Sequence, residues 1–121
     1  MKGNVIRLLI TCTSAALIAL TAPNSVLAAS AERGKVAYIQ SGCWQCHGTM
    51  GQGSIMTSGG KRLAPDPMPW EAFSSFVRST NRTMPPYSET ILPDGDLADI
   101  YAYLQSIPKP PDANSLPLLK P

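Results

Sequence analysis

The residues with the most distinctive chemistry lie close together between positions 43 and 47. Cys43 and Cys46 are separated by two residues, and His47, the single histidine of the chain, follows directly. Two thiols about one helical turn apart can each add to a vinyl group of a porphyrin, and the next imidazole then lies under the metal. The pattern therefore predicts one covalently attached haem c, held by Cys43 and Cys46, with His47 as the proximal iron ligand.

Two other uses of this cysteine pair compete with haem attachment. Cys43 and Cys46 would form a redox or structural disulfide in a thioredoxin-like protein, but that needs a βαβ context that the sequence does not suggest. A zinc site would need a fourth ligand placed beside them. With a single histidine, the chain also cannot supply a multi-histidine metal site.

A haem with one histidine ligand needs a second axial ligand, and methionine is the candidate type. Met50 is only three residues past His47, and Met56 lies in a glycine-rich loop. Met84 is far enough along the chain to reach the opposite face of the ring, and Pro85 favours an extended backbone there. We expect Met84 to be the distal ligand, with Met68 as the main alternative.

Three helices are expected to position these residues. Ser30 can cap a helix over residues 31–41, and a second helix follows Pro69 to about residue 79. The clearest apolar periodicity begins near Asp94 and ends at Pro108. Residues 48–69 are rich in glycine and proline, which predicts a long loop. Because loops of this length are unusual in compact domains, we expect other contacts to order it. We therefore predict an all-α fold of three to four helices and long loops around one haem.

The two ends of the chain have compositions of their own. Residues 1–7 are basic, residues 8–22 carry no charge, and small residues follow, which is typical of a secretory signal peptide. The uncharged run is short for a membrane-spanning helix, so no stable membrane anchor is expected. We divide the chain into a signal peptide over residues 1–28, which contains Cys12, a haem domain over residues 29–108 and a proline-rich, extended tail over residues 109–121.

Composition excludes several classes of protein. A chain of 121 residues is one domain at most, and 44% hydrophobic with 15% charged residues is unlike a disordered chain. The formal net charge is only +2 and no basic run occurs, so we expect no nucleic-acid partner.

The chain resembles the class I c-type cytochromes over nearly all of residues 29–108. The likeness rests on the helix that leads into the motif, the motif itself, Met84 with Pro85, and the last helix. The residues that carry it are Gly34, Lys35, Val36, Ala37, Tyr38, Gly42, Cys43, Cys46, His47, Gly48, Met84, Pro85 and residues 97–104.

This resemblance implies further contacts. The first and last helices should cross at Gly34, with Tyr101 or Leu97 packing into the gap. Lys61 stands where members of the family often have a proline, whose carbonyl accepts a hydrogen bond from the proximal imidazole, and the carbonyl of Lys61 can still do so. Lys61, Arg62 or Trp70 would contact a haem propionate, unless they belong to a solvated loop.

The function implied is one-electron transfer by a soluble carrier in the periplasm, without enzymatic activity of its own. Its partners would be a donor dehydrogenase and a downstream acceptor. Small cytochromes of this kind also serve as the haem subunit of periplasmic, often flavin-type, dehydrogenases or hydroxylases, which is the alternative. A third possibility is a ligand-binding haem sensor, which requires that Met84 leave the iron free.

Overall fold

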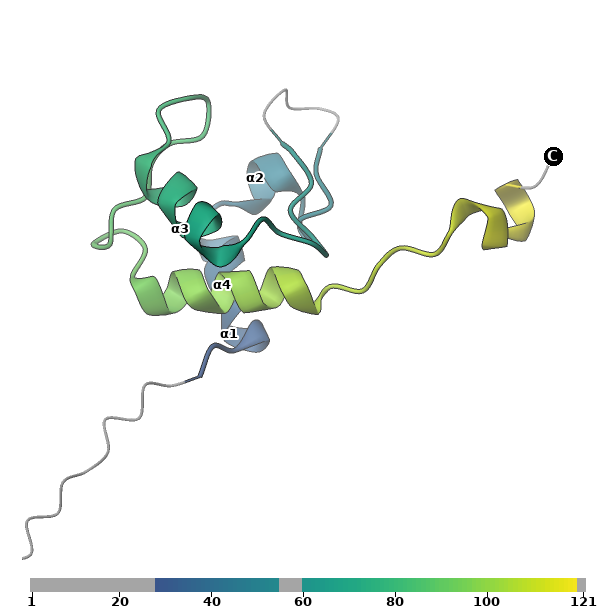
Figure 1. The fold of residues 1–121 in the computed structure, drawn as a ribbon, viewed down its shortest axis with the longest axis horizontal. Coiled ribbons are helices and arrows are strands. Elements are labelled where there is room, and N and C mark those ends of the chain that lie inside the picture. The colour runs from purple at the N-terminus through teal and green to yellow at the C-terminus, as the bar shows by residue number, and fades with distance from the viewer. Residues whose placement is uncertain (1–27, 55–59, 120–121) are drawn as a thin grey trace, which may run out of the picture.

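The computed structural model describes residues 28–54 and 60–119, and within them every regular element is helical (Figure 1). The elements are α1 (Ala31–Gln40), α2 (Trp44–His47), α3 (Trp70–Ser79) and α4 (Asp94–Ser106), followed by two 3₁₀ turns, η1 (Ala113–Ser115) and η2 (Pro117–Leu119). The predicted all-α fold is confirmed. The expected signal peptide, with Cys12, and Met56 lie outside the described residues.

The ends of the helices follow local signals. Ser30 caps α1, because its hydroxyl accepts a hydrogen bond from the main-chain N–H of Arg33 at 3.3 Å. Pro69 and Pro93 stand directly before α3 and α4. Gly42 has φ of +75°, a left-handed conformation that glycine adopts without strain, and it separates α1 from α2. The three predicted helices therefore begin and end within about two residues of their expected limits.

Helices α1 and α4 cross in direct contact at Gly34 (Figure 1). The nearest atoms to a side chain added at Gly34 would be the main-chain carbonyl of Asp99 and the amide of Ile100. The expected crossing is confirmed, but the backbone of α4, rather than the side chain of Tyr101 or Leu97, lies closest to the glycine. The close approach explains why glycine stands in the middle of a helix, where it otherwise costs about 1 kcal/mol relative to alanine.

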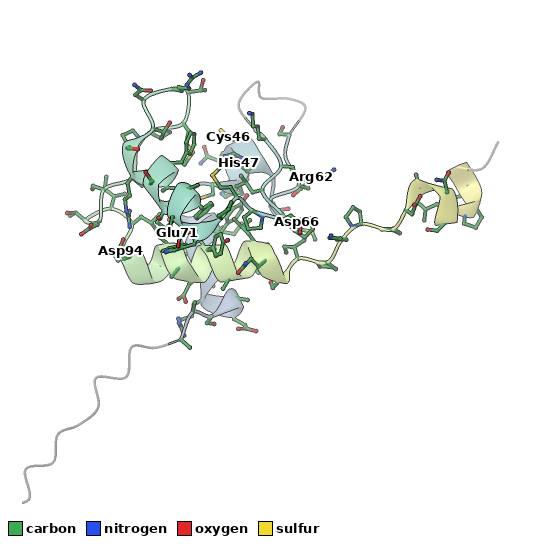
Figure 2. All side chains as sticks on the ribbon, viewed as in Figure 1. Cys46, His47, Arg62, Asp66, Glu71 and Asp94 are labelled. Atoms are coloured by element: carbon green, nitrogen blue, oxygen red, sulfur yellow. The ribbon has the colours of Figure 1, made fainter. Side chains whose placement is uncertain are left out.

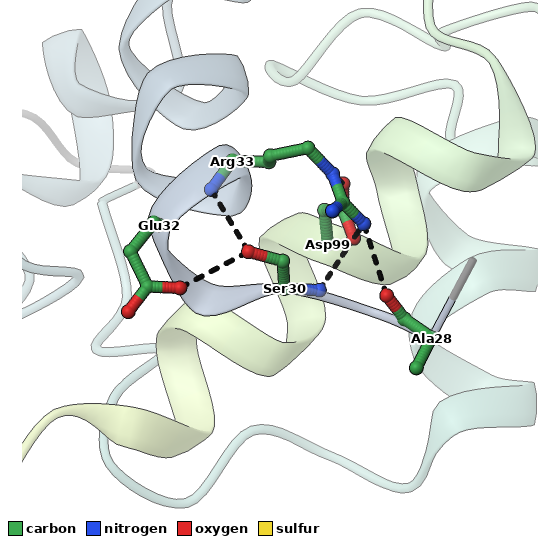
Figure 3. A network of polar contacts seen from close by, with 5 residues as sticks. All are labelled: Ala28, Ser30, Glu32, Arg33 and Asp99. Carbon is green, nitrogen blue, oxygen red and sulfur yellow. Dashed lines mark hydrogen bonds and ion pairs between the residues drawn. The ribbon is translucent and has the colours of Figure 1, made fainter.

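The side chain of Asp99 joins α4 to the start of α1, through an ion pair with Arg33 and a hydrogen bond from the main-chain N–H of Ser30 (Figure 3). Asp99 is 4% exposed, and its carboxylate accepts from Nε of Arg33 at 2.7 Å, from Nη2 of Arg33 at 2.9 Å and from the N–H of Ser30 at 2.6 Å. These contacts, the guanidinium first, hold the pKa of Asp99 below its usual value.

The apolar core lies between these crossed helices and α3. Tyr38, Leu97 and Leu104 are almost completely buried, and Phe73 and Val77 of α3 belong to the same cluster. Beyond the core, residues 109–119 extend away from the helices (Figure 1). This tail is not extended throughout, because η1 and η2 form in it. In the described part of the chain, no helix is long and apolar enough to cross a membrane.

Candidate haem-binding site

Cys43 is the N-cap of the one-turn helix α2 and Cys46 lies within it, and a glycine stands on either side of this segment. Gly42 and Gly48 have φ of +75° and +76° on either side of it. Cys43 is partly buried against the core, and burial raises the pKa of its thiol to about 11, whereas Cys46 is exposed. The main-chain N–H of His47 donates to the carbonyl of Cys43 at 3.0 Å. One helical turn thus presents both thiols and the imidazole, as the motif predicted.

The imidazole of His47 is oriented by the main chain of the following loop. Its Nδ1 lies 2.7 Å from the carbonyl oxygen of Lys61. Because a carbonyl can only accept, Nδ1 carries the hydrogen, which leaves Nε2 as the nitrogen able to bind a metal. The expected hydrogen bond to Lys61 is confirmed, although lysine replaces the proline that is frequent at this position.

Main-chain hydrogen bonds organise the loop that carries this carbonyl. The N–H of Gly53 donates to the carbonyl of His47 at 2.8 Å, and the N–H of Leu63 donates to that of Gly51 at 2.7 Å. A third bond joins the N–H of Ser54 to the carbonyl of Gly60 at 2.9 Å. Residues 51–54 and 60–63 are therefore held side by side, and this holds the carbonyl of Lys61 within hydrogen-bonding distance of His47.

A cavity of about 560 Å³ opens beside the imidazole of His47, and residues of α3, α4 and the loops that carry Lys61 and Met84 form its walls. Figure 2 shows Cys46 and His47 above α4. The walls of this cavity are mostly apolar, and both Met68 and Met84 line it together with His47. The remaining lining residues are Tyr38, Cys43, Lys61, Arg62, Leu63, Phe73, Phe76, Val77, Thr80, Arg82, Thr83, Tyr87, Leu92, Leu97, Ile100 and Leu104. A large apolar cavity with a cysteine, a histidine and methionines in its wall fits haem c.

The two candidate distal methionines differ in their surroundings. A smaller cavity of about 60 Å³ is lined by Cys46, His47 and Met84, together with Thr83, Pro85 and Tyr87. Met84 is also partly buried against the core, whereas Met68 is 45% exposed. Met50 is 48% exposed and lines neither of these cavities. These surroundings favour Met84 over Met68.

Three cations stand at the larger cavity. Lys61, Arg62 and Arg82 line it, and none of them forms an ion pair with a described residue. Trp70 does not line either of these cavities, and its ring instead packs on Tyr101, with the centroids 5.3 Å apart. Lys61 and Arg62 therefore remain candidates to contact a propionate, Arg82 joins them, and Trp70 is placed in the aromatic packing.

The sequence did not predict a role that the tyrosines share; of these residues, only Tyr101 was given a part, in helix packing. All four hydroxyls donate to main-chain carbonyls, and three of the acceptors flank the motif. Tyr87 donates to Ser41 at 2.9 Å, Tyr38 to Gly48 at 2.7 Å, Tyr103 to Thr49 at 2.9 Å and Tyr101 to Met68 at 3.2 Å. Tyrosine hydroxyls that are at least partly buried need partners, so tyrosine rather than phenylalanine at positions 38, 87 and 103 was the available signal.

The described residues support neither a zinc site nor a thioredoxin-like disulfide at the two cysteines. The described residues contain no group of three or more His, Cys, Asp or Glu that could hold a metal ion, as a zinc site would require. No strand occurs among residues 28–54 and 60–119, so the βαβ context of a thioredoxin-like disulfide is absent from the part that the structure describes.

Comparison with known proteins agrees with the haem assignment. Residues 29–104 match the family described as cytochrome c oxidase, cbb3-type, subunit III. No curated protein and no solved structure matches the chain. Because the match covers most of the chain, together with the motif and the cavity, this protein belongs to the c-type cytochromes of that family, whose function is haem-based electron transfer.

Proposed function

We propose that this chain carries one covalently attached haem c, bound through Cys43 and Cys46, with His47 and Met84 as axial ligands. The observation that carries the proposal is the shared lining of the two cavities. His47 and Met84 both line the 560 Å³ cavity, and they meet again with Cys46 around the smaller one. Both axial positions are then filled by side chains of the chain itself, which leaves no position open for a substrate. We therefore infer an electron-transfer protein rather than an enzyme.

Each residue has a defined part in this function. When bound, haem supplies an iron that gains and loses one electron. The hydrogen bond from His47 to the carbonyl of Lys61 holds the ring in one orientation and increases the basicity of the other nitrogen. The thioether of Met84 favours ferrous iron, and the apolar walls disfavour the additional charge of ferric iron, so both raise the reduction potential.

We further infer that the protein works outside the cytoplasm, in the periplasm, as a soluble carrier. The basic first residues and the uncharged stretch over residues 8–22 support export, with processing after Ala28. Processing after Ala28 would remove Cys12 and leave Cys43 and Cys46. Both remaining thiols would then be used to attach haem, which is consistent with an exported protein.

The alternative is a haem subunit of a larger periplasmic dehydrogenase or hydroxylase of the flavin type. The tail favours it, because Leu116 is 37% and Leu118 97% exposed on a segment that extends away from the helices. Gel filtration of the protein from its native host, with and without residues 109–121, separates the two. A free carrier elutes as a monomer in both cases, whereas a subunit elutes with its partner only when the tail is present.

The haem assignment is tested by expressing the whole chain in a bacterium that attaches haem c. The alkaline pyridine spectrum of the purified protein should be that of haem with both vinyl groups saturated, and reductive titration should consume one electron per haem. Cys43→Ser and Cys46→Ser should each leave one vinyl group unsaturated, whereas Cys12→Ser is the matched control and should change nothing. A colourless protein whose two remaining thiols react freely with alkylating agents would contradict the proposal.

A further inference from the structure

Tyr87 lies three residues after Met84, and all three of its polar groups are engaged. Its main-chain N–H donates to the carbonyl of Val77 at 3.0 Å, and its own carbonyl accepts from Nη1 of Arg78 at 2.9 Å. Both contacts attach the residue to α3. Its hydroxyl reaches back 46 positions in the sequence and donates to the carbonyl of Ser41 at 2.9 Å.

Ser41 belongs to the segment that leads directly into the haem-attachment motif. It is the C-cap of α1, and Gly42 and Cys43 follow it. The bond from Tyr87 to Ser41 therefore connects the loop that carries Met84 with the segment that carries Cys43, Cys46 and His47. Tyr87 also lines both cavities at which His47 and Met84 meet.

The stretch around Met84 has few other attachments. No main-chain N–H of residues 81–86 donates a hydrogen bond to a described residue, and Pro85 and Pro86 have none to donate. The hydroxyl of Thr80 lies 3.5 Å from the carbonyl of Met84, at the outer limit of a hydrogen bond. The position of Met84 thus depends mainly on how Tyr87 is anchored.

We infer that Tyr87 is the positioning residue of the distal ligand, because its hydroxyl fixes the loop of Met84 against the segment of the proximal ligand. Arg78 completes the anchor. Its Nη1 binds the carbonyl of Tyr87, while its Nη2 binds Asp94 at 2.5 Å, and its side chain is only 20% exposed. The inference rests on the proposed ligation by His47 and Met84. It adds that the strength of the bond between Met84 and iron is set by a contact outside the ligands.

The test is Tyr87→Phe in the purified, haem-loaded protein, which removes a single oxygen atom. Two readouts report on the bond between methionine and iron. These are the temperature at which the methionine-to-iron charge-transfer band of the ferric protein disappears, and the apparent affinity of the ferric protein for cyanide, which competes with Met84. Loss of one hydrogen bond should increase cyanide affinity roughly fivefold, the equivalent of about 1 kcal/mol, and should lower the temperature of band loss.

Tyr101→Phe is the matched control, since it removes a hydroxyl that donates to Met68, outside both ligand segments. It should leave both readouts at their wild-type values. Arg78→Gln removes the second anchor of Tyr87 and should act in the same direction as Tyr87→Phe. Asp94→Asn removes only the negative charge beside Arg78 and leaves the bond from Nη1 to Tyr87 in place, so it should not. The arginine variant keeps the test decisive if Tyr87→Phe does not fold.

Failure of the inference about Tyr87 and failure of the proposed ligation by Met84 would give different results. A wild-type band that Met84→Ala abolishes, combined with Tyr87→Phe and Arg78→Gln proteins that bind cyanide as the wild type does, overturns the inference and leaves the proposed ligation intact. A wild-type protein without the band, or a Met84→Ala protein that keeps it, overturns the ligation and the inference together.

Discussion

Gly34 of α1 packs directly against the main-chain carbonyl of Asp99 in α4, with no room for a side chain between the two helices. This contact sets the distance between the helices that carry Tyr38 on one side and Leu97, Ile100 and Leu104 on the other. Since all four of these residues line the larger cavity, the crossing at Gly34 determines the shape of the haem-binding site.

The first prediction concerns this crossing. In Gly34→Ala, the added methyl group overlaps the carbonyl of Asp99, so the helices must move apart, at a cost of about 1–3 kcal/mol in the free energy of unfolding. Guanidinium unfolding of the haem-loaded protein, followed by circular dichroism, measures the cost. Gly95→Ala is the matched control, because nothing lies within 4 Å of its added methyl group. It should increase stability by about 0.5–1 kcal/mol. Equal stabilities of the two variants would show that the helices do not meet at Gly34.

The second prediction concerns the pH dependence of stability. The pKa of Asp99 is lowered in the folded protein, chiefly by Arg33 and then by the N–H of Ser30. Its contribution to stability is therefore complete above the unfolded pKa of about 3.9 and is lost as the pH falls through the lower folded value. Asp99→Asn should lower the denaturation midpoint at pH 7, and the difference from the wild type should shrink below about pH 4. A difference that stays constant down to pH 2 would rule out the contribution of this ion pair.

The third prediction concerns the cations at the cavity. A positive charge near the iron disfavours the additional charge of ferric iron, so Arg62→Gln and Arg82→Gln should each lower the reduction potential. The shifts should diminish at high salt, because both side chains are exposed. Lys35→Gln removes an exposed cation of α1 that lines neither cavity, and its potential should equal that of the wild type. If Lys35→Gln shifts the potential as much as Arg82→Gln does, the effect is one of net charge rather than of position.

The features that the sequence predicted depend on neighbours along the chain. The cap at Ser30, the prolines before α3 and α4, and the spacing of Cys43 and Cys46 at α2 each act within a few residues. The hydrogen bond between His47 and Lys61 spans only 14 positions and was implied by the resemblance. These elements and the proximal half of the site could therefore be predicted.

The features that the sequence could not predict join distant segments. Asp99 meets Arg33 across 66 positions, and Tyr87 meets Ser41 across 46. Neither pair has a local signal, because each depends on how the helices pack. The choice between Met68 and Met84 is of the same kind. Both lie near prolines in the sequence, and only their burial and their neighbours in the folded chain distinguish them.

The central claim is that Met84 and His47 bind the iron from opposite sides, and one set of spectra tests it most directly. The visible spectrum of the ferric, haem-loaded protein is recorded for the wild type, Met84→Ala and Met68→Ala. We predict a methionine-to-iron charge-transfer band in the wild type and in Met68→Ala, and its absence in Met84→Ala, which should also bind carbon monoxide when reduced. A band that persists in Met84→Ala and disappears in Met68→Ala would contradict this account and assign the distal position to Met68.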